Sequence, residues 1–225
     1  MPRKSSKSSS NRKQSVSPRT KKVFGSLLVA MTGVGGLLLM LNGRPAPSGK
    51  GFALTPLMAV GRPETLESIY QTVTPVEDGR WLAIVVHDSG RASGNPDSLE
   101  AEARAMKLKN GLGYHFVIGN GNGMPDGELF VGERWRRQTS GAHVAGSRAD
   151  WFNHNSIGIC LVGDGNRRAF TEEQLGRLRQ LINSLCQELK VPADHVYLHS
   201  QLARTSSPGI FFPETAFRES LSATR

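Results

Sequence analysis

The chain has 225 residues, of which 38% are hydrophobic and 21% are charged, a composition typical of a globular protein. This composition excludes a fibrous or wholly disordered chain, and the length suits one domain with appendages. The net charge of +9 does not indicate a nucleic-acid partner, because eight of the 28 basic residues lie within residues 1–22. The rest of the chain carries 20 basic and 19 acidic residues, so it is nearly neutral.

The N-terminal segment is basic and rich in serine, and it contains no acidic residue. We expect residues 1–22 to form a disordered cytoplasmic tail, because they lack apolar groups to bury. A scaffold whose tail contacts anionic lipid or nucleic acid is one possible class of function. Membrane topology and retention explain the charges more simply, so we expect no nucleic-acid partner.

The next segment, Val23–Leu41, is 19 residues long and uncharged. At about 1.5 Å per residue, a helix of this length nearly crosses a hydrocarbon core of roughly 30 Å. Because a basic block precedes it, the segment predicts a single-pass signal anchor in the cytoplasmic membrane. The C-terminal part would then lie outside the cytoplasm, in the periplasm or cell wall. A buried core helix and a cleaved signal peptide are the alternatives.

Residues 42–61 are rich in Gly, Pro, Ser and Ala and predict a linker, so we expect the globular domain over residues 62–225. The apolar run Trp81–Ser89 predicts a buried central strand. A helix is expected after it, capped by Asp97 and stopped at Asn110–Gly111. We expect Leu99, Ala103 and Met106 to lie on one face of this helix.

The remaining elements predict a hairpin, a strand, a helix and a last strand. Tyr114–Gly119 and Glu128–Glu133 flank a segment rich in Gly, Pro and Asp, which favours an antiparallel hairpin. The order of elements predicts an α/β fold with a mixed central β-sheet flanked by helices. The later elements are a strand over Ser156–Gly163, a helix from the capping box of Thr171 and Gln174 to about Lys190, and a strand over Asp194–Ser200.

Two cysteines, Cys160 and Cys186, occur in the chain. An exported domain permits a disulfide, but one cysteine lies in a strand-like run and the other in a helix-like run. We expect two free buried thiols.

Two histidines, His87 and His199, end predicted strands. Polar residues at the carboxyl ends of strands line the ligand crevice of an open α/β sheet. This position alone is modest support for a functional site, because a histidine at a strand end is more often a satisfied hydrogen-bonding residue.

Several motifs give the pattern more weight. They are "GYHFVI", "GAH", "HNSIGICLVG", and His199 followed eight residues later by Ser207 before "PG". In this order and spacing they resemble the type 2 N-acetylmuramoyl-L-alanine amidases, a family that includes phage amidases and peptidoglycan recognition proteins. The resemblance covers about Trp81 to Phe217. It implies an amidase-like fold preceded here by the transmembrane helix, peptidoglycan or muropeptides as partners, and hydrolysis of the amide between N-acetylmuramic acid and L-alanine.

The resemblance also implies roles for individual residues. Zinc ligands would be His87, His199 and, doubtfully, Ser207, because the family has cysteine or aspartate at the last position. Tyr114 and Thr205 would orient water or donate to the oxyanion. Substrate-binding residues would be His143 and Asn155 in the cleft and Trp135 in a loop beside the groove, next to Arg136 and Arg137. His115 is discounted, because strand alternation turns it away from Tyr114.

Ser207 leaves the activity open. A serine hydroxyl keeps its proton at neutral pH, so it is a poor zinc ligand beside two imidazoles. The chain is then a weakened zinc amidase in which water or Ser207 completes the site, or a peptidoglycan-binding module that does not cut. Asp88 would reach the metal only across a bulge, because it points to the other face from His87. We favour the amidase by a small margin.

Overall fold

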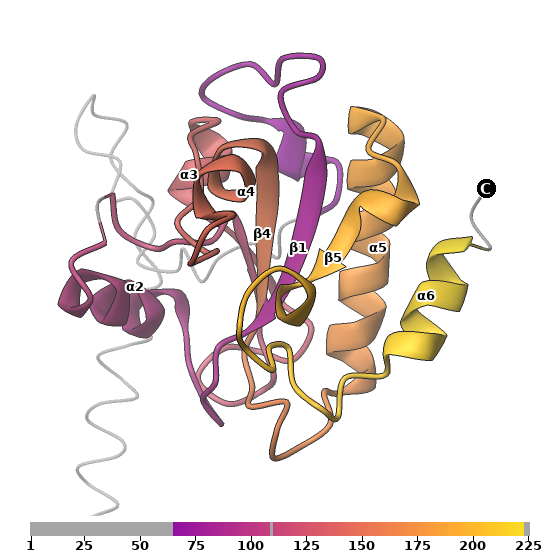
Figure 1. The fold of residues 1–225 in the computed structure, drawn as a ribbon. Coiled ribbons are helices and arrows are strands. Elements are labelled where there is room, and N and C mark those ends of the chain that lie inside the picture. The colour runs from indigo at the N-terminus through magenta and orange to yellow at the C-terminus, as the bar shows by residue number, and fades with distance from the viewer. Residues whose placement is uncertain (1–64, 109, 223–225) are drawn as a thin grey trace, which may run out of the picture. The chain divides into compact units, whose positions relative to one another are not determined.

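The computed structural model describes residues 65–108 and 110–222 (Figure 1). The predicted tail, the predicted transmembrane segment 23–41 and the predicted linker lie outside the described residues. Within the described ranges, every helix is too short or too polar to cross a membrane. The anchor therefore stays a prediction from the sequence.

The centre of the domain is a five-stranded mixed sheet in the order β3-β2-β4-β1-β5. β1 (Ala83–Asp88) pairs in parallel with β4 (Ser156–Leu161) and with β5 (Val196–Leu198). β2 (Phe116–Ile118) is parallel to β4 and antiparallel to β3 (Leu129–Val131). The predicted strands, the hairpin and the mixed sheet are confirmed.

Helices flank this sheet, as predicted. The α-helices are α2 (Pro96–Ala105), α3 (Glu133–Arg136), α4 (Ala149–Asn155), α5 (Glu172–Leu189) and α6 (Glu214–Ser222). The short 3-10 helices are η1 (Ser68–Tyr70), η2 (Ala193–His195) and η3 (His199–Gln201). α5 and α6 lie side by side (Figure 1), and α3, α4 and α6 were not predicted.

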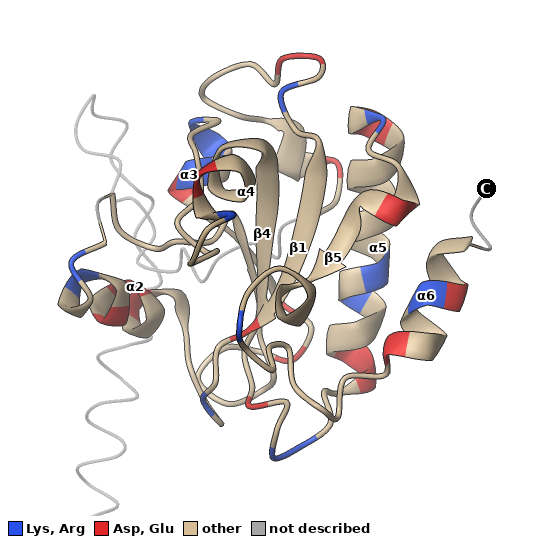
Figure 2. Cartoon of the chain, viewed as in Figure 1, with Lys and Arg blue, Asp and Glu red and all other residues tan. Residues whose placement is uncertain are grey.

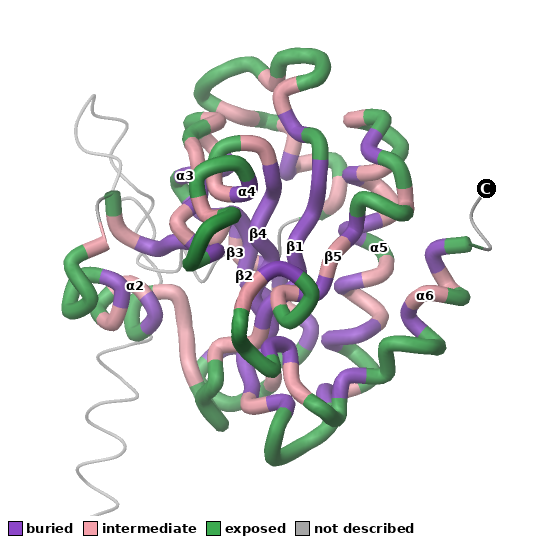
Figure 3. The backbone as a smooth tube through the Cα atoms, in the orientation of Figure 1, coloured by how far each residue is buried: buried purple, intermediate pink, exposed green. Residues whose placement is uncertain are grey.

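The two faces of the sheet are covered differently. Ile84 and Val86 of β1 belong to the main hydrophobic core, which also contains the apolar face of α5. Ala83 and Val85 alternate with them and pack against Phe152 of α4 on the other face. β1 and β4 are buried along most of their length (Figure 3). His87 continues this alternation, so its side chain lies on the face opposite α5.

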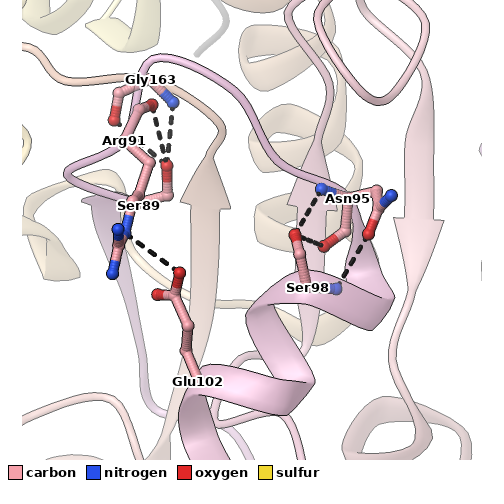
Figure 4. A network of polar contacts seen from close by, with 6 residues as sticks. All are labelled: Ser89, Arg91, Asn95, Ser98, Glu102 and Gly163. Atoms are coloured by element: carbon pink, nitrogen blue, oxygen red, sulfur yellow. Dashed lines mark hydrogen bonds and ion pairs between the residues drawn. The ribbon is translucent and has the colours of Figure 1, made fainter.

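Helix α2 differs from its prediction at both ends. Its N-cap is Asn95, whose Oδ1 accepts a hydrogen bond from the Ser98 amide at 2.8 Å, while Ser98 Oγ accepts one from the Asn95 amide (Figure 4). Asp97 lies inside the first turn, because Pro96 already occupies the first helical position. The helix ends at Ala105, before Met106, which is 67% exposed.

Helix α5 agrees with its prediction. Thr171 and Gln174 form the reciprocal capping box, and the helix stops where Lys190 takes a left-handed conformation at φ 57°. Gln174 Nε2 also donates to the carbonyl oxygens of Ile118 and Val162. The start of α5 is therefore tied to the carboxyl ends of β2 and β4.

The two thiols are free, as predicted. Cys160 is buried in β4 and Cys186 is half-buried in α5. Burial raises the pKa of Cys160 and raises the pKa of Cys186 to about 11, so both thiols are protonated at neutral pH.

Apart from Asp88 at the end of β1, the charged residues of the described part lie on helices and loops, and both signs are interspersed on α2, α5 and α6 (Figure 2). This distribution agrees with the nearly neutral charge of the sequence after residue 22.

Candidate active site

Four rings from distant segments of the chain meet at one end of the sheet. The ring centroid of His87 in β1 lies 4.4 Å from that of His199, 5.2 Å from that of Tyr114 and 4.9 Å from that of His143. His199 begins η3 directly after β5, and β5 pairs with β1. Strand pairing therefore brings residues over 100 positions apart into contact.

The histidine rings of this cluster are uncharged at neutral pH. Burial, with smaller contributions from the neighbouring histidines, holds the pKa of His87 well below its ordinary value. Burial also lowers the pKa of His143 to about 3 and lowers the pKa of His199. Neutral imidazoles are the form that binds metal ions.

Tyr114 lies just before β2 and stacks on His143, at an interplanar angle of 27°. Burial raises its pKa well above the ordinary value, so the phenol keeps its proton. Its O–H is therefore a hydrogen-bond donor beside His87.

His199 carries an unusual buried atom. Its Nε2 is the one buried side-chain nitrogen or oxygen in the described ranges that has no hydrogen-bond partner. A buried polar atom without a partner costs free energy unless a ligand occupies the space beside it. This atom is therefore suited to a ligand or a metal ion.

Ser207 lies in the loop after η3, beside the carboxyl end of β1. Its Oγ accepts a hydrogen bond from the Asp88 amide at 3.1 Å, and its own amide donates to Thr205 Oγ1 at 3.2 Å. Asp88 Oδ2 accepts from the Gly165 amide at 3.1 Å, so one oxygen of that carboxylate is already engaged by the backbone. Thr205 is exposed.

In the described part of the chain, no group of three or more His, Cys, Asp or Glu side chains is arranged to hold a metal ion. The two predicted imidazole ligands are adjacent, and the third predicted position is a hydroxyl. The residues thus provide two neutral nitrogen ligands for a metal ion and lack an anionic third ligand.

His143 is held in place by residues that the sequence analysis missed. The Oδ1 atom of Asn153 accepts hydrogen bonds from the His143 and Val144 amides, both at 2.9 Å. Its Nδ2 donates to the Val144 carbonyl at 2.8 Å. The imidazole lies against Gly158 of β4, where a β-carbon would overlap the ring. A glycine inside a strand is the sequence signal for such a close approach.

The prediction for Trp135 is wrong. Its side chain is fully buried in the core on the α5 face, its Nε1 donates to the Ile69 carbonyl at 2.6 Å, and its ring packs 5.0 Å from that of Phe116. Arg136 and Arg137 belong to the end of α3 and not to a groove loop. An indole with no exposed surface cannot contact a saccharide.

Asn155 ends α4, and its Nδ2 donates to the Trp151 carbonyl at 2.8 Å, so its place in a substrate cleft stays a prediction. His115 differs from expectation. His115 does lie near the cluster, 5.9 Å from the ring of His143, because β2 begins only at Phe116 and alternation does not apply before it. Its nitrogens are engaged by the Gly158 amide and the Thr139 carbonyl, so His115 is no ligand.

Comparison with known proteins gives the family. The model of the N-acetylmuramoyl-L-alanine amidase family Amidase_2 matches residues 77–210, more than half of the chain and all four rings of the cluster. The chain belongs to this family. The resemblance recognised in the sequence motifs is thereby confirmed.

Individual relatives agree with this assignment. A peptidoglycan recognition protein from Trichoplusia ni is 34% identical over 99 residues, which is 44% of this chain and 48% of that protein. The endolysin of Escherichia phage T7 is 35% identical over 79 residues, 33% of this chain and 44% of that protein. The chain spans about half the length of the curated relatives it matches.

Solved structures share the fold. The N-acetylmuramoyl-L-alanine amidase LysC from Clostridium intestinale superposes with a TM-score of 0.54 at 24% identity, covering 68% of this chain and 93% of that one. At this identity the likeness establishes the mixed-sheet fold and not the activity.

Proposed function

We propose that the chain is a zinc-dependent N-acetylmuramoyl-L-alanine amidase that hydrolyses the amide between N-acetylmuramic acid and L-alanine in peptidoglycan. The observation that carries this proposal is the buried, unpartnered Nε2 of His199 beside the ring of His87. Within a family of amidases, two adjacent neutral imidazoles at the carboxyl ends of β1 and β5 suit a cation-binding site.

His87 and His199 would hold the zinc ion, and Ser207 or water would complete its coordination. When bound, zinc supplies a water with a pKa lowered toward about 7 and polarises the scissile carbonyl. The two imidazoles contribute because they are neutral, which spares the cation the repulsion that protonated rings would exert.

Tyr114 and Thr205 supply the polar groups around the reacting amide. The protonated phenol of Tyr114 can donate to the oxyanion that forms when the carbonyl is attacked. Thr205 Oγ1 accepts from the Ser207 amide, which leaves its own O–H proton available to water or substrate.

A peptidoglycan-binding module that does not cut is the second candidate, and Ser207 favours it. The Ser207 oxygen already accepts a hydrogen bond from the Asp88 amide, and a neutral hydroxyl holds a dication less tightly than a thiolate or carboxylate. A site that lost its metal could still bind muropeptides through the remaining polar groups.

An assay with muropeptides separates the two candidates. The full chain in detergent is incubated with muropeptides at several Zn²⁺ concentrations, and free stem peptide is measured by mass spectrometry. We expect release that depends on zinc and disappears in His199→Ala. Binding without release under all metal conditions would identify the module, and neither binding nor release would reject both candidates.

We further propose that Val23–Leu41 anchors the domain outside the cytoplasm, where peptidoglycan lies; the uncharged run after a basic block supports this. Protease added to intact spheroplasts should digest the domain while residues 1–22 remain protected. Recovery of a soluble domain whose N-terminus follows Leu41 would instead indicate a cleaved signal peptide.

A further inference from the structure

We propose that His143 is a positioning residue that fixes the tautomer of His87, holding the proton on Nε2 and leaving Nδ1 free to bind a cation. The first part follows from hydrogen bonds in the structure. Only its consequence for a cation rests on the proposed function.

A backbone carbonyl sets the position of the proton on His143. His143 Nε2 lies 3.4 Å from the Ser156 carbonyl oxygen, which can only accept a hydrogen bond. His143 must therefore carry its proton on Nε2, because a lone pair there would face the lone pairs of the oxygen. The His143 ring is buried beside the imidazoles of His87 and His115, which keeps it neutral, so its Nδ1 is then an acceptor.

The hydrogen bond between His143 and His87 then determines which nitrogen of His87 carries the proton. His143 Nδ1 lies 3.0 Å from His87 Nε2, and one of the two atoms must donate. Because His143 Nδ1 holds a lone pair, His87 Nε2 donates its N–H. The His87 ring is buried between the rings of His143 and His199, which keeps it neutral, so its Nδ1 is unprotonated.

Neighbouring residues hold the hydrogen bonds from Ser156 through His143 to His87 in one direction. Asn153 fixes the backbone of His143 through hydrogen bonds, and Gly158 leaves room for the imidazole against β4. His115, the other buried ring nearby, is occupied by the Gly158 amide and the Thr139 carbonyl, so it does not compete for His143.

The consequence for a cation is direct. A metal-binding histidine usually donates its second N–H to a carboxylate or carbonyl, which sets the ring orientation. In this chain a neutral imidazole takes that place and passes the hydrogen bond on to the Ser156 carbonyl. The opposite tautomer would put a proton on the nitrogen that has to face the cation.

The tautomer can be measured without a metal. The full chain, labelled with ¹⁵N-histidine and kept in detergent with a chelator, gives long-range ¹H–¹⁵N spectra, and His87→Gln identifies the His87 signals. We expect His87 to carry its proton on Nε2. A proton on Nδ1 in the unmodified chain would overturn the proposal, and this measurement needs no variant at position 143.

Two variants test the cause. His143→Asn keeps an acceptor oxygen near the position of Nδ1 and should preserve the tautomer, whereas His143→Leu removes it and should give a mixture. His154→Gln, at an exposed histidine of α4, is the matched control and should change nothing. An unchanged His87 spectrum in His143→Leu would overturn the proposal.

Zinc titration adds a second readout. Calorimetry should show affinity about 10- to 100-fold weaker in His143→Leu and near the unmodified value in His143→Asn, as expected for a partner of a metal ligand. Equal affinities in the two variants would contradict a positioning role. If the unmodified chain binds no zinc, the zinc-dependent amidase fails, while the tautomer measurement still decides the role of His143.

Discussion

At the scale of single residues, the site lacks an anionic third ligand for a metal ion. Two imidazoles meet at the carboxyl ends of β1 and β5, and Ser207 occupies the third predicted position with its oxygen turned to the Asp88 amide. The hydroxyl is buried and satisfied by the backbone, so it can stabilise the loop without any metal ion. Its substitution by a thiol tests the coordination directly.

Ser207→Cys should raise Zn²⁺ affinity by on the order of 100-fold or more, because a thiolate supplies the charge that a neutral hydroxyl lacks. Zinc titration with a competing chelator measures the change. Ser206→Cys is the control, since Ser206 is exposed and its Oγ accepts from Asn166. Equal affinity of the two variants would show that residue 207 does not face the metal.

Tyr114→Phe should lower the rate of stem-peptide release by roughly 100-fold while muropeptide binding changes little, because the phenol donates chiefly in the transition state. The release rate and muropeptide affinity are measured on zinc-loaded protein. Tyr197→Phe, in β5, is the matched control. A similar loss in both variants would assign Tyr114 a packing role only.

Sequence motifs located most of these residues but not their contacts. His87, His199 and Tyr114 were found because the motifs carry their spacing. Trp135 was misplaced, because a tryptophan beside two arginines suits an exposed loop, and only the packed structure shows its indole in the core. Asn153 was missed because its role depends on how α4 folds back onto the His143 loop.

At the scale of elements, the longest segments were predictable and the short ones were not. α5 shows helical periodicity over 18 residues and a capping box, whereas α3 has four residues and α4 has seven, too few for a periodic signal. The start of α2 was placed two residues late because both Asn95 and Asp97 suit an N-cap. Strand order is set by long-range pairing and required the structure.

The loop that carries Ser207 docks on a second loop through two glycines. A β-carbon on Gly165 would overlap the Pro208 carbonyl, and one on Gly209 would overlap the backbone of Gly165. The Phe211 amide donates to the Gly165 carbonyl at 2.8 Å across the same contact. Close backbone approach therefore sets the position of Ser207 relative to β1.

Gly165→Ala should destabilise the domain by about 1–3 kcal/mol, because two backbone segments must move apart. Gly176→Ala is the matched control: its β-carbon would meet open space within α5, so we expect stabilisation of up to about 1 kcal/mol. Urea denaturation followed by circular dichroism measures both. Equal effects of the two substitutions would contradict the close contact.

At the scale of the whole molecule, the buried histidines link stability to pH. His87, His115 and His143 have pKa values lowered by burial, that of His143 to about 3. Below about pH 6.5 the unfolded chain binds protons that the folded chain excludes. Each buried imidazole therefore lowers the free energy of unfolding by up to about 1.4 kcal/mol for each unit that the pH falls. Their stabilising contribution is complete above pH 6.5 and is lost as the pH falls.

The free energy of unfolding of the metal-free chain should therefore drop steeply between pH 6.5 and pH 4. Urea denaturation at several pH values with a chelator measures it. His154→Gln, which replaces an exposed histidine, should keep the same slope. Equal stability at pH 7.5 and pH 5 would contradict neutral burial of the three rings.

The pairing of β5 with β1 also determines when the four rings can come together. His199 follows β5, so a ribosome must synthesise the chain past residue 199 before that ring can join His87. A growing or partly translocated polypeptide contains only an incomplete cluster. Any hydrolytic activity of the domain is thus withheld until synthesis has passed β5 and the edge strand has docked.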